Sequence, residues 1–491
     1  MSTEKNFFRD EPAYGDMPVE AFRRAGHQVI DWIADYLKEV GRLPVLPAVQ
    51  PGAVRRALPA TPPPHGEDMT AVLADLDRLI MPGMTHWNHP RFFAYFTSSA
   101  SGPGILGDLL AAAFNSNSML WQASPAATEL EEVTLDWLRQ MLGLPADFWG
   151  LIFDTASTST LHGLAAAREQ LGDLQIHERG MAGRADLPRL RLYVSDYTHS
   201  SIDKAALLIG LGREGIRRIP VDAEFRMQPA ALAQAIQDDR RAGWRPFCVV
   251  ATVGTTSCTS IDPVAEIAQI CATENLWLHV DAAHGGAVAI VPEMRHVLAG
   301  CELADSFVVN PHKWLFVPMD LSVLYTRKPE VLRRAFSLVP EYLRTPADSG
   351  VINYMDYGIP LGRRFRALKL WFVLRSFGVT GLQACIREHL RLAREFAGWV
   401  DRHPDFERLA PVPMSTICFR AHPASLNEES RLNELNERLL HAVNRTGEAF
   451  LSHTKIDGRF VLRLVISHLR VTPADVERVW AVLQQQLGAL N

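Results

Sequence analysis

A lysine follows a short apolar run in the second half of the chain. Phe307–Val309 predicts a buried strand, and the next segment, Asn310–Trp314, places Lys313 between bulky neighbours, Pro311 and Trp314. Removing a lysine amine from water lowers its pKa and makes it a nucleophile toward carbonyl groups. Lys313 is therefore a candidate for Schiff-base chemistry, with an ordinary surface lysine as the alternative when it is considered alone.

A carboxylate occupies a comparable position 32 residues earlier. The apolar run Leu276–Val280 ends in Asp281, and the residues that follow, Ala282–Gly286, are small apart from His284. Small residues after a strand allow a flat ligand to approach the backbone. A pyridoxal phosphate site needs a lysine to carry the cofactor and a carboxylate to pair with its pyridine nitrogen. Asp281 alone could be a capping residue, but with Lys313 it predicts such a site.

Two further segments supply the other parts of that site. The run of small residues Thr155–Thr160 follows the predicted strand Gly150–Phe153 and opens a helix, where free backbone N–H groups bind phosphate well. An ordinary N-cap box is the alternative for this run. His199 follows the predicted strand Leu190–Ser195, where its imidazole can stack on a cofactor ring or serve as a structural histidine.

These residues are positioned by an alternation of β-like and helical stretches between residues 101 and 370. Continuous apolar runs are typical of strands covered on both faces, so the alternation predicts an α/β domain with a mainly parallel sheet. Ligands bind at the carboxyl ends of strands in such sheets, which is where the candidate residues lie. The predicted strands are Gly150–Phe153, Leu190–Ser195, Ile216–Pro220, Phe247–Thr252, Leu276–Asp281, Ser306–Asn310 and Leu321–Tyr325.

The two ends of the chain differ from this middle part. Pro18–Val40 predicts an amphipathic helix, and Gly41–Gly66, with seven prolines, predicts extended chain. Such an arm cannot bury its own apolar face, so it must pack on another domain or on a second subunit. Two predicted strands among helices, Ser415–Phe419 and Phe460–Ser467, indicate a smaller α+β domain at the C-terminal end. The predicted division is an arm over 1–100, a large α/β domain over 101–370 and a C-terminal domain over 371–491.

The composition is that of a soluble globular protein and disfavours several functions. Of the 491 residues, 47% are hydrophobic and 21% charged, which argues against disorder. The net charge of -5 gives no excess of positive charge for binding nucleic acid or an anionic membrane. Met1–Glu11 lacks the apolar core of a secretory signal, and no apolar run is long enough to span a membrane. The six scattered cysteines, without a C-x-x-C pair, indicate reduced thiols in a cytoplasm.

Taken in order along the chain, these segments resemble the pyridoxal-phosphate-dependent group II decarboxylases, and among them the aromatic-L-amino-acid decarboxylases. The resemblance covers nearly the whole chain at the family's spacing. It is carried by His89–Phe96, Ser124–Glu131, His199–Ser201, His279–Ala283, Asn310–Trp314 and Ile359–Arg366. It implies a fold-type I enzyme, like aspartate aminotransferase, that binds pyridoxal 5'-phosphate. It also implies a homodimer whose active sites lie at the subunit interface, with the N-terminal arm wrapped around the partner.

The resemblance implies a role for individual residues as well. Lys313 would carry the cofactor, Asp281 would pair with the pyridine nitrogen, and His199 would stack on the ring. The implied cofactor contacts are Ala156, Ser157, His199, Thr252, Asp281, Ala283, Asn310, His312 and Lys313. The implied substrate contacts are Trp87, Tyr95, Phe96, Ser98, His199 and Gly362, the last being the residue of the aromatic-acid branch.

A loop tyrosine decides which product the resemblance predicts. The polar stretch Ser337–Tyr354 looks like a mobile active-site loop, and Tyr342 matches the family tyrosine that supplies the final proton. Relatives that form an aldehyde carry Phe at that position, or Asn in place of the stacking histidine. Because Tyr342 and His199 are both present, we expect an aromatic L-amino acid to be converted to its amine and CO2. An aromatic aldehyde synthase and a decarboxylase of a non-aromatic amino acid remain as alternatives.

Several residues near the expected substrate depart from the family pattern. His284 stands where the family usually has Tyr, Asn117 and Met119 replace an apolar residue and a Phe, and Thr97 replaces a Pro. The pocket is therefore expected to be more polar than in the family. Tyrosine, DOPA, tryptophan, 5-hydroxytryptophan and phenylalanine all remain candidate substrates.

Three other functions are weaker alternatives. An aminotransferase usually needs an arginine clamp for the substrate carboxylate, for which Arg364 or Arg463 is available. A metal hydrolase would use His279, His284 and Asp281, but no H-E-x-x-H or C-x-x-C spacing supports it, and no metal is expected. A non-catalytic scaffold would not need the lysine, carboxylate and histidine together.

Overall fold

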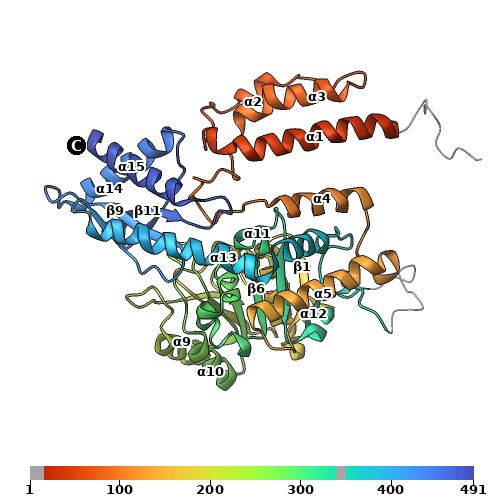
Figure 1. Ribbon diagram of the computed structural model, residues 1–491. Coiled ribbons are helices and arrows are strands. Elements are labelled where there is room, and N and C mark those ends of the chain that lie inside the picture. The colour runs from red at the N-terminus through yellow and green to blue at the C-terminus, as the bar shows by residue number, and fades with distance from the viewer. Residues whose placement is uncertain (1–15, 339–349, 491) are drawn as a thin grey trace, which may run out of the picture.

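The computed structural model describes residues 16–338 and 350–490 of the chain (Figure 1). Within these residues the central element is a sheet of seven strands in the order β1-β7-β6-β5-β4-β2-β3. Strands β3, β2, β4, β5 and β6 are parallel, whereas β7 runs antiparallel to both β6 and β1. The strands are β1 (Trp149–Phe153), β2 (Arg189–Ser195), β3 (Ile216–Ile219), β4 (Trp244–Thr252), β5 (Trp277–Asp281), β6 (Ser306–Val309) and β7 (Ser322–Thr326). The predicted mainly parallel α/β fold is confirmed, and each predicted strand begins within three residues of an observed one.

Helices cover both faces of this sheet, as the continuous apolar strands require. Strands β5 and β6 are buried along their whole length. One face packs against α5 (Pro125–Leu142), α9 (Pro229–Arg241), α10 (Val264–Glu274) and the first half of α13 (Ala367–Arg402). The other face packs against α6 (Ala156–Glu169), α8 (Ser200–Leu208) and α12 (Pro329–Phe336).

A second, antiparallel sheet lies in the C-terminal part, in the order β10-β11-β9-β8. Its strands are β8 (Phe406–Arg408), β9 (Thr416–Ala421), β10 (Ser452–Ile456) and β11 (Arg459–Val465), packed against α13, α14 (Glu429–Arg445) and α15 (Pro473–Leu490). The two predicted strands correspond to β9 and β11. Strands β8 and β10 were not predicted, because β8 has only three residues and β10 is largely polar, with only Ile456 fully buried. Helix α13 links the two sheets across the predicted boundary at residue 370 and contains a non-helical Gly378.

The helices at the start of the N-terminal arm stand apart from the two sheets (Figure 1), whereas Phe93 near its end packs in the core of the second sheet, where its backbone oxygen accepts the Val465 N–H. Helix α1 (Val19–Glu39) has no buried residue, and Phe22 on it is 65% exposed. The prediction of extended chain throughout Gly41–Gly66 is wrong in part, because α2 forms a short helix over Ala53–Ala57. The reason is that no proline interrupts the backbone N–H groups between Pro51 and Pro59. No helix in the described part of the chain is long and apolar enough to cross a membrane.

Candidate active site

The sheet brings the predicted chemistry to one edge. Thr252 is the last residue of β4 and pairs with Asp281, the last residue of β5, which in turn pairs with Val308 of β6. Asn310 directly follows β6 and caps the short helix α11 (Pro311–Trp314) that carries Lys313. Residues that are up to 61 positions apart in sequence thus meet because parallel strands share their carboxyl edge.

Lys313 lies in an environment that favours its neutral amine. Burial lowers the pKa of Lys313 to about 8; the negative charge of Asp281 opposes this shift, and the positive charge of Arg463 adds to it. The segment is fixed from both sides. The Ser98 hydroxyl donates to the backbone oxygen of His312 over 2.6 Å, and the Leu321 N–H donates to His312 Nδ1 over 2.9 Å. Lys313 therefore combines a reactive amine with a rigid support.

His199 and Asp281 are also held by the backbone. His199 is the N-cap of α8, and its Nδ1 accepts the Ser201 N–H over 3.1 Å. Burial lowers the pKa of His199 below its ordinary value, so the ring is neutral where it lines the cavity. The Asp281 carboxylate is 6% exposed, and its Oδ1 accepts the Ala283 N–H over 3.1 Å. These two side chains keep fixed directions without depending on a ligand.

Buried polar atoms without hydrogen-bond partners indicate whether these residues could hold pyridoxal phosphate. The Oγ1 of Thr252 and the Oδ1 of Asn310 are buried and have no hydrogen-bond partner among the described residues. Such atoms are costly to bury, and they indicate that a polar ligand belongs beside them. Ala156 and Ser157 begin α6, where the first backbone N–H groups of a helix have no partner within it and attract phosphate. The donor set therefore fits the cofactor.

A cavity of about 520 Å³ opens beside Lys313. Of the predicted residues, Tyr95, Phe96, His199 and Lys313 line it. A further part of the wall comes from the C-terminal part of the chain, and of its residues only Arg463 was named from the sequence, as a loose aminotransferase clamp. It consists of Leu440, His441, Asn444, Phe450, Leu451, Ser452, His453, Thr454 and Arg463.

Arg463 is the most informative residue of this wall. It is 3% exposed, its Nε donates to the backbone oxygen of Ser257 over 3.1 Å, and its Nη1 donates to that of Tyr95 over 2.6 Å. Its Nη2 has no partner among the described residues, and burial lowers the pKa of Arg463 to about 10. In the sequence, Arg463 stands inside the apolar strand β11. It suggested only a weak candidate for the arginine that binds the substrate carboxylate in an aminotransferase.

Other predicted residues do not line this cavity in the single chain. Trp87 is 41% exposed and packs on Phe92, with 4.3 Å between ring centroids, and Ser98 binds backbone as described above. Gly362 lines a separate cavity of about 270 Å³, near Asn117, whose Oδ1 accepts the Arg363 N–H. Tyr342 lies outside the described residues.

The structure also locates the remaining predicted cofactor contacts and the residues considered for a metal site. Ala283 and His312 are buried beside Asp281 and Lys313. His279 binds the Ser306 hydroxyl through Nδ1. In residues 16–338 and 350–490, no group of His, Cys, Asp and Glu is arranged to hold a metal ion.

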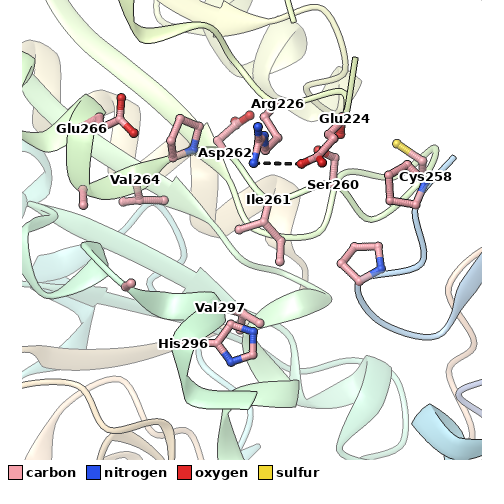
Figure 2. Close-up of a pocket in the computed structure, with 15 residues that line it drawn as sticks. Glu224, Arg226, Cys258, Ser260, Ile261, Asp262, Val264, Glu266, His296 and Val297 are labelled. Atoms are coloured by element: carbon pink, nitrogen blue, oxygen red, sulfur yellow. Dashed lines mark hydrogen bonds and ion pairs between the residues drawn. The ribbon is translucent and has the colours of Figure 1, made fainter. Parts of the chain in front are cut away.

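A different cavity, of about 350 Å³, is lined in part by the loop that follows β4, including Cys258 and Ser260 (Figure 2). Arg226 and Glu224 form an ion pair of 2.9 Å at its rim, and Asp262 and His296 are among its lining residues. None of the predicted site residues in the described part of the chain lines this cavity. The chemistry is therefore concentrated at the cavity beside Lys313.

Comparisons with known proteins agree with this geometry. Residues 51–422 match the pyridoxal-dependent decarboxylase conserved domain. The chain is 43% identical to aromatic-L-amino-acid decarboxylase of Bos taurus, over 96% of this chain and 97% of that protein. It is 40% identical to phenylacetaldehyde synthase of Arabidopsis thaliana, over 96% and 97% of the two chains. The crystal structure of Oryza sativa TDC with PLP and tryptamine is similar with a TM-score of 0.93 and 39% identity, covering 97% of this chain and 99% of that one.

Proposed function

The chain belongs to the pyridoxal-dependent decarboxylase family and is thus a carboxy-lyase that uses pyridoxal phosphate; from this premise we propose that it converts an aromatic L-amino acid to its amine and CO2. One observation carries the proposal: Lys313, with its pKa lowered to about 8, lines one cavity together with His199, and the charge of Asp281 acts on both side chains. This is the combination that cofactor attachment and electron withdrawal require.

Each residue at the strand ends takes a part in holding the cofactor. Lys313 would be the attachment point, Asp281 would pair with the pyridine nitrogen and favour its protonated form, and His199 would stack on the ring. The backbone N–H groups of Ala156 and Ser157 at the start of α6 would hold the phosphate. The unpartnered polar atoms of Thr252 and Asn310 would contact the cofactor, and Ala283 and His312 keep the contacts that the resemblance implies. When bound, pyridoxal phosphate withdraws the electron pair that the departing CO2 leaves behind.

The substrate is oriented by groups of this chain. The unpartnered Nη2 of Arg463 is a suitable donor for the α-carboxylate before it leaves, since charge-assisted hydrogen bonds to a buried guanidinium are strong. Tyr95 and Phe450, with ring centroids 5.7 Å apart in an edge-to-face arrangement, provide aromatic surface at the cavity. These contacts favour an aromatic side chain, and aromatic amino acids are also the substrates that the names of several relatives state.

The product depends on where the last proton comes from. We assign this proton to the Tyr342 hydroxyl, which would deliver it to the substrate α-carbon and so release an amine. Phenylacetaldehyde synthase is a relative of similar identity, so an aldehyde product is the second candidate. Trp87, Ser98 and Gly362 keep their proposed substrate roles only in an assembly where a second subunit contributes to the site.

A homodimer is the assembly that we propose, because the arm exposes an apolar face that a single chain does not cover. A cytoplasmic location is proposed as well, on the support of the six cysteines, none of which is in a disulfide.

Product analysis tests the function. The purified protein is incubated with each of the twenty amino acids, DOPA and 5-hydroxytryptophan, and the products are identified by mass spectrometry. The proposal expects an amine from at least one aromatic amino acid, whereas an aldehyde with ammonia and peroxide would favour the second candidate. Amine formation only from acidic or aliphatic amino acids would refute the aromatic substrate.

A further inference from the structure

His284 lies buried behind the cavity in a column of three rings. Its imidazole is parallel to the Trp314 indole, with centroids 4.8 Å apart at 4°, and to the Phe96 ring, with centroids 3.7 Å apart at 12°. His284 is 1% exposed and does not line the cavity beside Lys313. It therefore has no direct part in the proposed chemistry, although it touches a residue that does line the site.

The other face of Phe96 carries two cations. The Nζ of Lys313 lies 5.0 Å and the guanidinium carbon of Arg463 lies 4.6 Å from the centre of this ring. Because the parallel imidazole of His284 covers one face at 3.7 Å, both cations must lie over the opposite face. Cations are attracted to an aromatic face, so the plane of Phe96 is a supporting surface for them.

This surface restricts the arginine that we propose as the carboxylate donor. Two nitrogens of Arg463 are fixed by the backbone oxygens of Ser257 and Tyr95, and the third, Nη2, has no partner in the described residues. The guanidinium is planar, so the direction of Nη2 stays fixed as long as the ring of Phe96 keeps its orientation beneath it. Tilting of Phe96 would remove that support.

Stacking alone holds His284 in this column. Both of its ring nitrogens are buried without a hydrogen-bond partner in the described residues, so no polar contact accounts for its position. Burial lowers the pKa of His284 well below its ordinary value, and the charges of Lys313, Arg463 and His389 act in the same direction. The ring is therefore neutral, as a position close to two cations requires.

We propose that His284 is a positioning residue, whose flat neutral ring holds Phe96 in plane and thereby directs Nη2 of Arg463 at the substrate carboxylate. The inference rests on the proposed function of Arg463 and concerns a position where the family usually has Tyr. It predicts that a flat ring is required at residue 284, and that the imidazole nitrogens are not.

The test uses the holoenzyme and two probes of the same shape, one with a carboxylate and one with a neutral amide in its place. These are 3-(4-hydroxyphenyl)propionate and its neutral amide, neither of which carries an amine that reacts with the cofactor. Their dissociation constants are measured by calorimetry for the wild type and for His284→Leu, which keeps bulk but has no flat face. We expect His284→Leu to weaken binding of the carboxylate by about tenfold, as for loss of a charged hydrogen bond, and binding of the amide by less than about threefold.

Two variants separate positioning from general damage. His284→Phe restores a flat ring and removes two unpartnered nitrogens, so it should bind both probes like the wild type and melt at a higher temperature. Val400→Ala, in the core around the second sheet, should lower the melting temperature without changing the preference for the carboxylate.

Arg463→Gln distinguishes failure of the inference from failure of the proposed function. If Arg463→Gln loses the carboxylate preference while His284→Leu keeps it, the role of His284 is overturned and the proposed function stands. If Arg463→Gln also keeps the preference, the carboxylate contact is wrong and the inference fails with it. If His284→Phe behaves like His284→Leu, the flat ring is not what matters, and the inference is overturned as well.

Discussion

At the scale of single residues, the site combines an easily deprotonated amine with histidines that remain neutral. Burial lowers the pKa values of His199 and His312, the latter to about 3, so neither adds positive charge beside Lys313. Asp281 is the nearby anion that raises the pKa of Lys313. A neutral amine, which we propose attaches the cofactor, is thus more accessible near neutral pH than in an ordinary lysine.

The first prediction concerns the Lys313 amine in the cofactor-free chain. Its reaction with an amine-reactive reagent, followed by mass spectrometry of the Lys313 peptide, should show a titration midpoint at about 8. Asp281→Asn should move this midpoint lower, because the anion that opposes the shift is lost. A midpoint near the ordinary 10.5 would contradict the geometry.

At the scale of elements, strand ends explain which parts of the site could be predicted. Lys313, Asp281 and His199 each follow an apolar run, and topology alone brings such ends to one edge. The wall from the C-terminal part of the chain could not be predicted, and Arg463 was only one of two candidate arginines, because this wall depends on how the second sheet packs against the first. That packing involves contacts between distant segments, such as Arg463 with the backbone of Tyr95, which local patterns do not specify.

The second prediction concerns the beginning of α6. Ala156→Asp places a negative charge where we propose that phosphate binds, so affinity for pyridoxal phosphate should fall by roughly tenfold or more. The helix itself should not suffer, because acidic residues are favourable at helix N-termini. Cofactor affinity is measured by absorbance titration, with Ala230→Asp in the first turn of α9 as the control. Equal affinity of the two variants for pyridoxal phosphate would contradict the proposal that phosphate binds at the start of α6.

At the scale of the whole molecule, apolar side chains gather on the N-terminal arm and the helix that follows it. Phe22 of α1 is 65% exposed, and Leu109 and Phe114 of α4 (Gly102–Phe114) are 49% and 61% exposed. Exposed patches of this kind mark protein interfaces. The arm was expected from the sequence because an isolated amphipathic helix cannot bury its own face, whereas the identity of what covers it cannot be derived from one chain.

The third prediction is that α4 forms part of the homodimer interface. Leu109→Glu should convert a wild-type dimer to a monomer in sedimentation velocity, because a buried, unpaired charge opposes association. Leu208→Glu, at a leucine that is 73% exposed on α8, should leave the dimer intact. A wild-type monomer, or a Leu109→Glu dimer of unchanged affinity, would contradict the proposed assembly.

The fourth prediction concerns stability in acid. Burial lowers the pKa values of His162, His279 and His389 to about 4, below the ordinary 6.5 that applies when the chain is unfolded. Between pH 6.5 and 4 the unfolded chain therefore binds more protons than the folded one, and the free energy of unfolding should fall as the pH falls. Each such histidine contributes up to about 1.4 kcal/mol per pH unit. Urea unfolding at pH 7.5 and pH 5 measures the difference, and equal midpoints would contradict neutral buried histidines.

Release of labelled CO2 tests the central claim most directly. The wild type and Lys313→Ala, both supplied with pyridoxal phosphate, are incubated with an aromatic L-amino acid labelled in its carboxyl carbon. The account predicts steady release of the label and one equivalent of amine from the wild type, and almost none from a folded Lys313→Ala. Undiminished release from Lys313→Ala, or no release by the wild type from any aromatic amino acid, would contradict it.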